Sequence, residues 1–557
     1  MAVTRLKFGK TQVINMRNVN KIFMNGHIQT VDDHNSVVEA VGITGDRIIA
    51  VGDLTYVLER MPSDSEKNDL EGKTLIPAFI DPHGHFPDPG FIDLFRVDLA
   101  SPPRGQCVCL KDAFRLIAEK VTQTPKGEWV MGAALDHTSL SEGRMPYKDE
   151  LDAISTEHPI WVIHASGHCG TANSMALELQ GINEDIQDIL GGRFLRDRAG
   201  RLNGQIEGIS AMGDMGDTHF LINSERFREG FNTCRDEYLS YGVTLAQNAW
   251  APTALLEMFA EVAADGDPGI DLVVLPIAEI EPAFSTSGLG ARWPDNPHVK
   301  LGPRKLFTDG SFQMRTAYLT EPFFTAQDGG EPDCGLPYVE RDVLFSEIKK
   351  LHDMGYQIHT HSNGDAGSDM LLDALEAALE DNPRGDHRHT LIHGQVLRDD
   401  QLARMKKLGV TVSFFSAHIY FWGDKHYTDF LGPDRANRIS PAGSAERAGV
   451  RYTIHNDASV TPTRPLHLMH CAVNRQTSSG RVLGGDQRIS AISALRAHTI
   501  DAAWQVFQEK ERGSIEPGKL ADLAILTDDP IANADHLDKL SVVETIRRGK
   551  SVWKKTV

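Results

Sequence analysis

The sequence predicts an α/β protein with a β-rich segment at each end of the chain. Three observations support this fold class. Strand-like and helix-like segments alternate from about residue 240 to 456, both ends of the chain are rich in short strands, and 557 residues suit an α/β barrel with additions. Repeated strand–helix units produce parallel strands, so the middle of the chain forms either a closed barrel or a doubly wound sheet.

The first part of the chain is predicted to form short β-strands. β-Branched residues gather in segments that are separated by Asn-Gly, Thr-Gly-Asp and Gly-Asp, which are turn signals. The predicted strands cover residues 19–23, 37–43 and 47–51. We expect this β-rich part to end near residue 76.

Residues 86–240 form the least regular stretch, and we interpret them as a large insertion. Helix-like pieces lie at 110–121 and 224–239, and a strand-like piece lies at 160–164. Regular alternation follows. Predicted strands cover residues 243–246, 271–277, 356–361, 390–393, 410–415 and 452–456, and predicted helices cover 254–264, 342–354, 366–380, 401–408 and 445–448.

The end of the chain returns to β-structure after a predicted helix at 492–508. Alternating apolar residues and turns favour strands within 513–526 and 542–552. Because chain termini tend to lie close together, we expect both ends to pair into one small β-domain. The predicted domains are therefore residues 1–76 with 510–557, and a barrel at 77–509 with an insertion within 86–240.

The bulk composition narrows the partners of the chain. The net charge is 57 − 77 = −20, which argues against nucleic acid or an anionic membrane as a partner. No run of 18 apolar residues exists, and the first residues lack the apolar core of a signal peptide. Six scattered cysteines do not resemble a disulfide framework. We expect a cytoplasmic protein that acts on a small molecule, and the sequence leaves homo-oligomerisation open.

The most informative motif is a His-x-His pair, His83 and His85, at the end of the apolar segment that begins at Leu75. Alternate side chains of a strand point to the same side, so both imidazoles face one way. Two neutral imidazoles from one backbone suit a divalent metal, and a metal at a strand end indicates hydrolytic chemistry through an activated water.

Five further candidates follow the ends of predicted strands, where α/β barrels carry their chemistry. They are His168, Lys305, His361, His393 and Asp457. Each has a simpler explanation: most histidines near strands are not ligands, most lysines are solvated, and Asp457 could cap a helix. Lys305, however, stands in an apolar segment, where a lysine needs a charge partner or loses its charge.

Together these motifs resemble the amidohydrolase superfamily, in particular the family 3 branch that includes N-substituted formamide deformylases. The matching segments run from residue 77 to 523 in family order. They are Pro77-Ala-Phe-Ile-Asp-Pro-His-Gly-His85, Gly167-His168 with Asn173-Ser174, Gly204-Gln-Ile-Glu207, Lys305-Leu-Phe-Thr-Asp-Gly-Ser311, His361-Ser-Asn-Gly-Asp365, His393, Asn456-Asp457, and Gly513-x-Ile-x-Pro-Gly-Lys-x-Ala-Asp-Leu523. Ala78 replaces a usual glycine, which removes no ligand.

The resemblance implies a TIM-type (β/α)8 barrel with a β-sandwich built from both termini. It also implies that His83, His85 and Asp457 bind one divalent metal, that His361 and His393 bind a second, and that Lys305, carboxylated by carbon dioxide, bridges them. Zinc is the favoured metal, as one or two ions per chain. Asp457 would act as general base, and we expect His168 to hydrogen-bond the substrate carbonyl.

The sequence therefore predicts a metal-dependent hydrolase of an amide, N-acyl or N-formyl C–N bond. A heterocycle deaminase is the first alternative, although the segment after His361 lacks the acidic His-x-x-Glu element of such sites. A catalytically inactive scaffold is the second, although no expected ligand is missing. The aromatic segment that contains Phe414, Phe415, Tyr420, Phe421 and Trp422 either lines the pocket or packs a loop, and the sequence favours neither.

Overall fold

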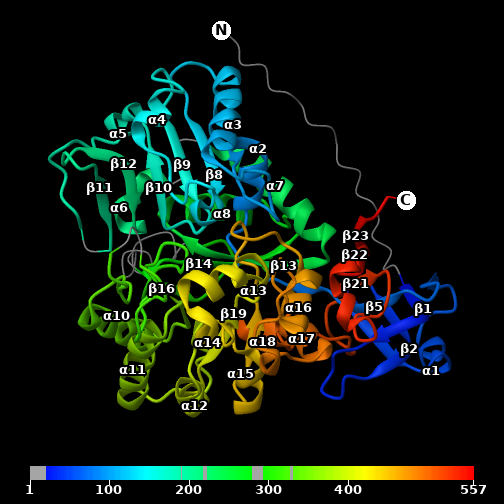
Figure 1. Ribbon diagram of the computed structural model, residues 1–557. Helices are drawn as coiled ribbons and strands as arrows, with labels where there is room; N and C mark the ends of the chain where they lie inside the picture. Colours follow the sequence, from blue (N-terminus) through cyan, green and yellow to red (C-terminus); the bar gives the residue numbers. More distant parts are fainter. Residues whose placement is uncertain (1–19, 190, 217–222, 279–292, 327–329, 557) are drawn as a thin grey trace, which may run out of the picture.

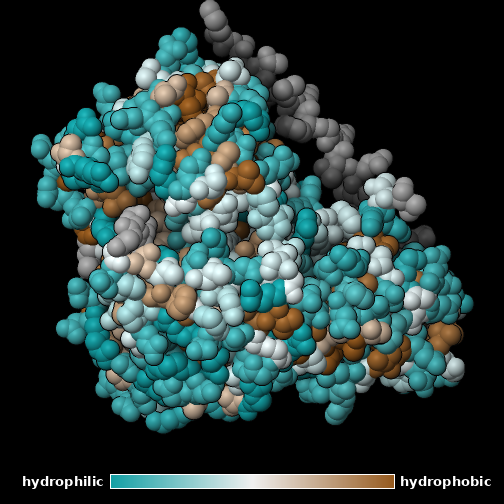
Figure 2. All heavy atoms as spheres, in the orientation of Figure 1, coloured by the Kyte–Doolittle hydropathy of each residue, from teal (hydrophilic) through white to brown (hydrophobic). Residues whose placement is uncertain are grey.

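The computed structural model describes residues 20–189, 191–216, 223–278, 293–326 and 330–556 (Figure 1). Residue 19, which begins the first predicted strand, and the N-terminal segment used to argue against a signal peptide lie outside these ranges. Hydrophilic residues dominate the face in Figure 2, and the hydrophobic ones form separate patches. No helix in the described ranges is both long and apolar enough to cross a membrane.

The two ends of the chain form one mixed sheet, at the right of Figure 1. Its strand order is β23-β22-β21-β5-β1-β2-β3, with β4 also paired to β1. The strands are β1 (Asn20–Gln29), β2 (Val37–Thr44), β3 (Arg47–Gly52), β4 (Glu66–Asp69), β5 (Thr74–Pro77), β21 (Leu523–Leu526), β22 (Val542–Arg547) and β23 (Lys550–Lys554), and α1 (Leu54–Arg60) follows β3. The antiparallel β5–β21 pair joins the two ends. The division of this sheet into two layers of a sandwich stays a prediction.

The middle of the chain forms parallel strands in two sheets, ordered β15-β14-β13-β6 and β16-β17-β18-β19-β20. The strands are β6 (Phe79–Ile80), β13 (Val243–Ala251), β14 (Asp271–Pro276), β15 (Val299–Leu301), β16 (Arg304–Phe307), β17 (Ile358–Ser362), β18 (Thr390–His393), β19 (Thr411–Phe414) and β20 (Tyr452–Ile454). A parallel bridge between Ile277 and Lys305 connects the two sheets.

The ring closes where β20 returns to β6. Asp457 N–H donates to His83 O over 3.3 Å, and His85 N–H donates to Ala458 O over 2.6 Å. The segments that follow β6 and β20 therefore lie side by side, although more than 370 residues separate them. This closed arrangement of parallel strands is an α/β barrel of the TIM class.

Helices surround the barrel (Figure 1). They are α8 (Thr253–Ala264), α10 (Arg341–Asp353), α11 (Asp365–Asp381), α12 (Asp399–Leu408), α13 (Ala417–Lys425), α14 (Gly432–Ala436), α15 (Ala442–Ala448), α16 (Pro465–Asn474), α17 (Ala491–Ala497) and α18 (Ile500–Gln505). Helix α13 lies where the barrel meets the insertion. The single helix predicted at 492–508 is two helices, α17 and α18. The chain leaves the helical path at His498, whose carbonyl accepts a hydrogen bond from Ile80 N–H at 2.8 Å, so the break joins these helices to β6.

Between β6 and β13 the chain builds a further sheet, ordered β11-β12-β10-β9-β8-β7. The strands are β7 (Val97–Asp98), β8 (Val130–Leu135), β9 (Ile160–His164), β10 (Cys169–Ala172), β11 (Arg193–Arg196) and β12 (Leu202–Glu207). The accompanying helices are α2 (Asp88–Phe95), α3 (Leu110–Gln123), α4 (Lys148–Asp152), α5 (Ser174–Leu179), α6 (Ile209–Gly216) and α7 (Ser224–Ser240). We call residues 86–240 the insertion, and we propose the domain boundaries given above on the basis of this pairing.

Candidate metal centre

The carboxyl ends of the barrel strands open into a cavity of about 410 Å³ between the barrel and the insertion. All the residues singled out from the sequence as site residues line it. They are His83, His85, His168, Lys305, His361, His393 and Asp457. Only a barrel brings these distant positions together, because the carboxyl ends of parallel strands meet at one rim.

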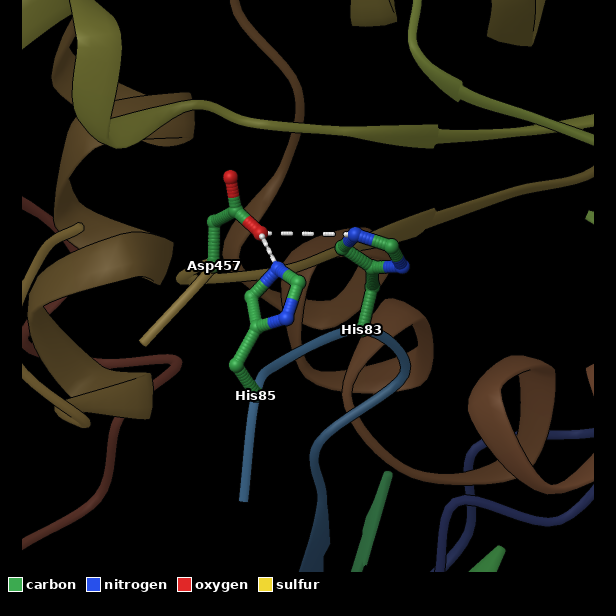
Figure 3. Close-up of side chains that lie close together, drawn as sticks. All are labelled: His83, His85 and Asp457. Carbon is green, nitrogen blue, oxygen red and sulfur yellow. Dashed lines mark ion pairs between the residues drawn. The ribbon is translucent and has the colours of Figure 1, made fainter. Parts of the chain in front are cut away.

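Asp457 lies between the two histidines of the His-x-His pair (Figure 3). Its Oδ1 is 3.3 Å from His83 Nε2 and 3.2 Å from His85 Nε2. The side chain of His83 is buried, and neither of its ring nitrogens has a hydrogen-bond partner within the described structure. Buried polar atoms normally have partners. The convergence of two imidazole nitrogens on one carboxylate oxygen is a donor set that fits a divalent cation.

His361 and His393 offer a second pair of nitrogens. His361 Nε2–H donates to Gly310 O at 2.9 Å, so its Nδ1 is the unprotonated nitrogen of the neutral ring. That Nδ1 faces His393 Nε2 at 3.0 Å, while His393 Nδ1 contacts His455 Nε2 at 3.1 Å. The contacts of His361 with Gly310 and of His393 with His455 therefore fix both rings. The remaining nitrogen of each ring faces the other ring.

Burial and charge set the protonation of this group. Burial lowers the pKa of His83, His361 and His393 well below the usual value, so the three rings are neutral at neutral pH, as metal ligands must be. Burial by itself would raise the pKa of Asp457, but the adjacent rings of His83 and His85 outweigh it and keep that carboxylate ionised.

Lys305 is buried in β16, 1% exposed, with its ammonium 4.8 Å from the centre of the Phe307 ring. Burial lowers the pKa of Lys305 to about 7, and the charge of Asp457 opposes this shift only in part. A large share of the lysine is therefore an uncharged amine at neutral pH. The prediction that Lys305 lies at the end of a buried strand is consistent with this position.

His168 approaches the site from the insertion, in the turn between β9 and β10. Its ring centre is 5.2 Å from that of His361, and burial lowers the pKa of His168 to about 4. It stands outside the groups of side chains whose ligand atoms converge. This geometry leaves a neutral imidazole beside the cavity.

Two buried residues lie next to the candidate ligands, although the sequence analysis did not name them as site residues. Ligand-type atoms of His455, His393 and Asp457 lie close together, and Asp309 Oδ1 is 3.6 Å from His361 Nε2. Asp309 accepts hydrogen bonds from the backbone N–H groups of Asn363 and Tyr318, at 2.9 Å each, and burial raises the pKa of its carboxyl to about 7. The Thr-Asp-Gly segment after Lys305 was the signal that could have identified Asp309.

Apolar side chains form much of the remaining cavity wall. The barrel supplies Trp250, Leu255 and Phe307, and the insertion supplies Phe91 and Ile163. None of the five aromatic residues around α13, from Phe414 to Trp422, lines this cavity, and Phe414, Phe415 and Trp422 are buried in the core. Phe415 lines a small adjoining pocket with His393 and Asp457, and the structure favours packing for the other four aromatic residues.

The chain is similar to known proteins over nearly its whole length. The model of the amidohydrolase family matches residues 67–553. An N-substituted formamide deformylase from Arthrobacter pascens is 28% identical over 96% of this chain and 98% of its own, and the protein LONG AFTER FAR-RED 3 from Arabidopsis thaliana is 26% identical over 95% and 91%. An uncharacterised metal-dependent hydrolase from Pyrococcus horikoshii has the same fold, with a TM-score of 0.72 and 23% identity over 93% of this chain and 99% of its own.

Proposed function

We propose, since this chain belongs to the amidohydrolase family, that its (β/α)8 barrel is a metal-dependent hydrolase that cleaves a C–N bond of an amide, N-acyl or N-formyl compound. The observation that carries this proposal is the convergence of His83, His85, Lys305, His361, His393 and Asp457 on one cavity.

The residues present fit a divalent metal, for which zinc is the favoured ion. Both nitrogens of His83 and Oδ1 of Asp457 are buried without hydrogen-bond partners in the described part of the chain, and cation ligation would satisfy them. His83, His85 and Asp457 would hold one ion, and His361 and His393 a second. When bound, the cation supplies Lewis acidity, which polarises the scissile carbonyl and makes an attacking water more acidic.

Asp457 and His168 would handle protons and orientation. The carboxylate of Asp457 is ionised and faces the cavity, so it can take a proton from the attacking water and pass it to the departing amine nitrogen. Neutral His168 can donate a hydrogen bond to the substrate carbonyl oxygen, and this bond strengthens as negative charge develops there.

Lys305 has the properties needed for reaction with carbon dioxide. Only an uncharged amine attacks carbon dioxide, and the low pKa of Lys305 supplies that form at neutral pH. The neutral amine would form a bond to the carbon of carbon dioxide and lose one proton, which gives a carbamate anion in the cavity. Bound divalent cations would offset the buried charge of that anion.

One relative supports an amide substrate. The matched protein from Arthrobacter pascens is an N-substituted formamide deformylase. A heterocycle deaminase is less well supported because Asp365, the acid nearest after His361, contacts Arg398 Nη1 at 3.2 Å and Thr320 N–H at 2.9 Å instead of facing the cavity. An inactive scaffold would not need to keep the complete donor set.

A panel assay tests this function. The protein is stripped with a chelator, reloaded with zinc or manganese, and offered N-formyl and N-acyl amines, N-acyl amino acids, cyclic ureas and aminoheterocycles. We expect amide hydrolysis that disappears on stripping and returns on reloading. Ammonia release from aminoheterocycles alone would favour the deaminase, and full activity without metal would contradict the mechanism.

A further inference from the structure

A buried chain of polar contacts, in which the Asp136–His164 step is an ion-pair contact and not a hydrogen bond, connects the barrel to the turn that carries His168. It begins at Trp422 in α13, whose indole Nε1–H donates to Asp136 Oδ2 at 2.8 Å, although 286 positions separate the two residues. Asp136 follows β8 and His164 ends β9, which are neighbouring parallel strands of the insertion. The contact therefore joins the two parts of the molecule that enclose the cavity.

The tautomer of His164 follows from its partners. The backbone N–H of Ser166 donates to His164 Nδ1 at 3.0 Å, and a backbone amide can only donate. Nδ1 therefore carries no proton and Nε2 does, and Nε2 lies 3.7 Å from Asp136 Oδ1, which is an ion-pair contact beyond hydrogen-bond distance. The Ser166 hydroxyl also lies 2.8 Å from His164 Nδ1, and it accepts a hydrogen bond from the backbone N–H of His168 at 3.2 Å.

Asp136 and His164, with neighbouring His137, place three ligand-type atoms close together, but the carboxylate is already saturated. Asp136 Oδ1 accepts from the backbone N–H and hydroxyl of Thr138, at 3.0 and 2.7 Å. Its Oδ2 accepts from the Ser139 hydroxyl at 2.9 Å and from Trp422. A cation would have to displace these bonds, so the arrangement favours a positioning role over a metal site.

We propose that Trp422, Asp136, His164 and Ser166 are positioning residues that fix the imidazole of His168 at the metal centre. The inference rests on the proposed function of His168. The segment that carries these contacts, from His164 to His168, is five residues long. The backbone carbonyl of His168 accepts from Gly208 N–H at 2.8 Å, so hydrogen bonds hold both sides of this residue. A displacement of about 1 Å in such a group costs roughly 100-fold in rate.

Ser166→Ala is the sharpest test, because it removes the acceptor of the His168 amide and keeps the backbone contact to His164. We expect kcat to fall about 10- to 100-fold with KM and metal content near wild type. Ser166→Thr, which keeps the hydroxyl, should restore most of the rate. Ser155→Ala is the matched control, because Ser155 Oγ contacts His158 Nδ1 at the same 2.8 Å distance, away from the cavity.

A double-variant cycle separates positioning from general stability. In a His168→Ala background, Ser166→Ala and Trp422→Phe should have almost no further effect on kcat, since the residue that they position is gone. Equal losses in both backgrounds, or an unchanged kcat in Ser166→Ala, would overturn the proposal.

Hydrogen exchange supplies a readout that needs no substrate. Amide exchange in peptides spanning 164–169 should be faster in Ser166→Ala than in the wild type, and unchanged in Ser155→Ala. Faster exchange in a protein that hydrolyses no amide would reject the proposed function and leave the positioning network intact. Unchanged amide exchange of these peptides in Ser166→Ala would contradict the positioning network, whether or not the protein hydrolyses an amide.

Discussion

At the scale of single residues, the site combines buried groups whose protonation is set by their surroundings. Asp457 and His393 both adopt left-handed backbone angles, with φ of 52° and 79°. Such conformations are costly for residues other than glycine and persist where the surrounding structure enforces them, often at functional sites. Their location at the ends of β18 and β20 supports the proposed roles.

Asp457→Asn removes the general base and keeps the size of the side chain. We expect a loss of kcat of roughly 100- to 10,000-fold, because proton transfer by a positioned group contributes about that much. The measurement is steady-state kinetics with metal analysis of the same sample. A rate close to wild type at full metal content would show that another group takes the proton.

Lys305→Ala removes the proposed bridge between the two ligand groups. We expect loss of activity and partial rescue by added formate or acetate, since a short carboxylate can replace the missing carbamate oxygens. Lys300→Ala on neighbouring β15, at an exposed position, is the control and should be unaffected. Equal activity of the Lys305 and Lys300 variants would exclude the bridge.

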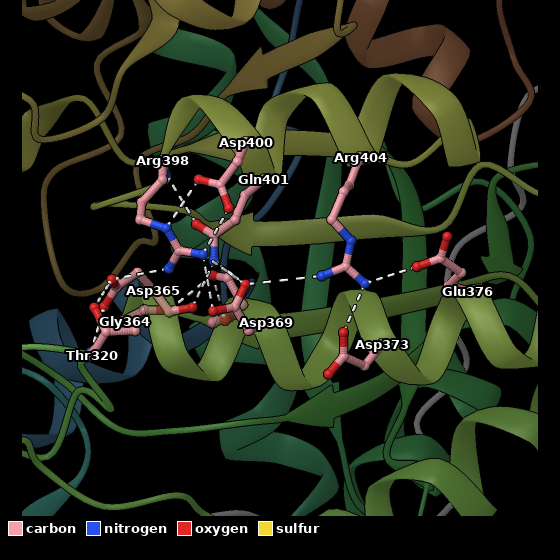
Figure 4. A network of polar contacts seen from close by, with 12 residues as sticks. Thr320, Gly364, Asp365, Asp369, Asp373, Glu376, Arg398, Asp400, Gln401 and Arg404 are labelled. Atoms are coloured by element: carbon pink, nitrogen blue, oxygen red, sulfur yellow. Dashed lines mark hydrogen bonds and ion pairs between the residues drawn. The ribbon is translucent and has the colours of Figure 1, made fainter.

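At the scale of elements, charged side chains fasten helix α11 to helix α12 (Figure 4). Arg404 on α12 contacts Asp373 at 2.7 Å and Glu376 at 3.0 Å on α11, and Arg398 contacts Asp369 through both carboxylate oxygens at 3.0 Å. These helices flank β18, which carries His393, so the network braces one wall of the barrel.

Arg404→Met tests this network while keeping the apolar stem of the side chain. We expect a loss of about 1 kcal/mol, because the groups are about one-third exposed and are partly screened by solvent. Thermal unfolding at low and high salt measures it, and the difference should shrink in high salt. Arg115→Met, whose pair with Glu119 is mostly exposed, should change little. An equal effect of the two substitutions would contradict a bracing role.

The predicted elements of the barrel agree with the structure where periodicity was strong. The strand predicted at 390–393 is β18 to the residue, and the helix predicted at 366–380 is α11 within one residue at each end. The helix predicted at 492–508 was wrong in its middle, because the break at His498 serves a hydrogen bond to β6. Local sequence does not encode such a distant partner.

At the scale of the whole molecule, buried charges join the terminal sheet to the barrel. Asp271 at the start of β14 contacts Arg512 and Arg547, and His298 Nδ1 lies 2.8 Å from its Oδ1. The side chains of Asp271 and Arg512 are 2% and 3% exposed. Arg512 Nη1 also lies 3.1 Å from Asp522 Oδ2, so removal of Arg512 leaves the buried carboxylate of Asp522 without this cation, while Arg547 still faces Asp271.

Arg512→Met should therefore destabilise the protein by about 3–5 kcal/mol. Arg47→Met is the matched control at the same sheet, because the Arg47 pair with Glu511 is largely exposed and should contribute little. Urea unfolding followed by fluorescence measures both. Equal urea midpoints for the two variants would show that Arg512 contributes no more to the free energy of unfolding than the exposed Arg47 does.

Acid should weaken this junction. Burial by itself would raise the pKa of Asp271, but Arg512, His298 and Arg547 outweigh it and lower that pKa. A lowered folded-state pKa stabilises the fold above the unfolded pKa of about 4, and this contribution is lost as pH falls. The stability difference between wild type and Asp271→Asn should therefore narrow below about pH 4 in urea unfolding. A stability difference that does not change with pH would contradict the lowered pKa of Asp271.

The sequence by itself determined the α/β alternation, the β-rich ends and the identity of the candidate ligands. Strand periodicity and the His-x-His spacing are local properties, and His361 and His393 lie at the ends of predicted strands, whereas β6 ends at Ile80 and the expected strand geometry of the His-x-His pair was wrong. Only the tertiary structure decided which atoms meet. The tautomer of His361, the burial that lowers the pKa of Lys305, and the contact of Trp422 with Asp136 depend on partners far away in the chain, which barrel closure and the insertion bring together.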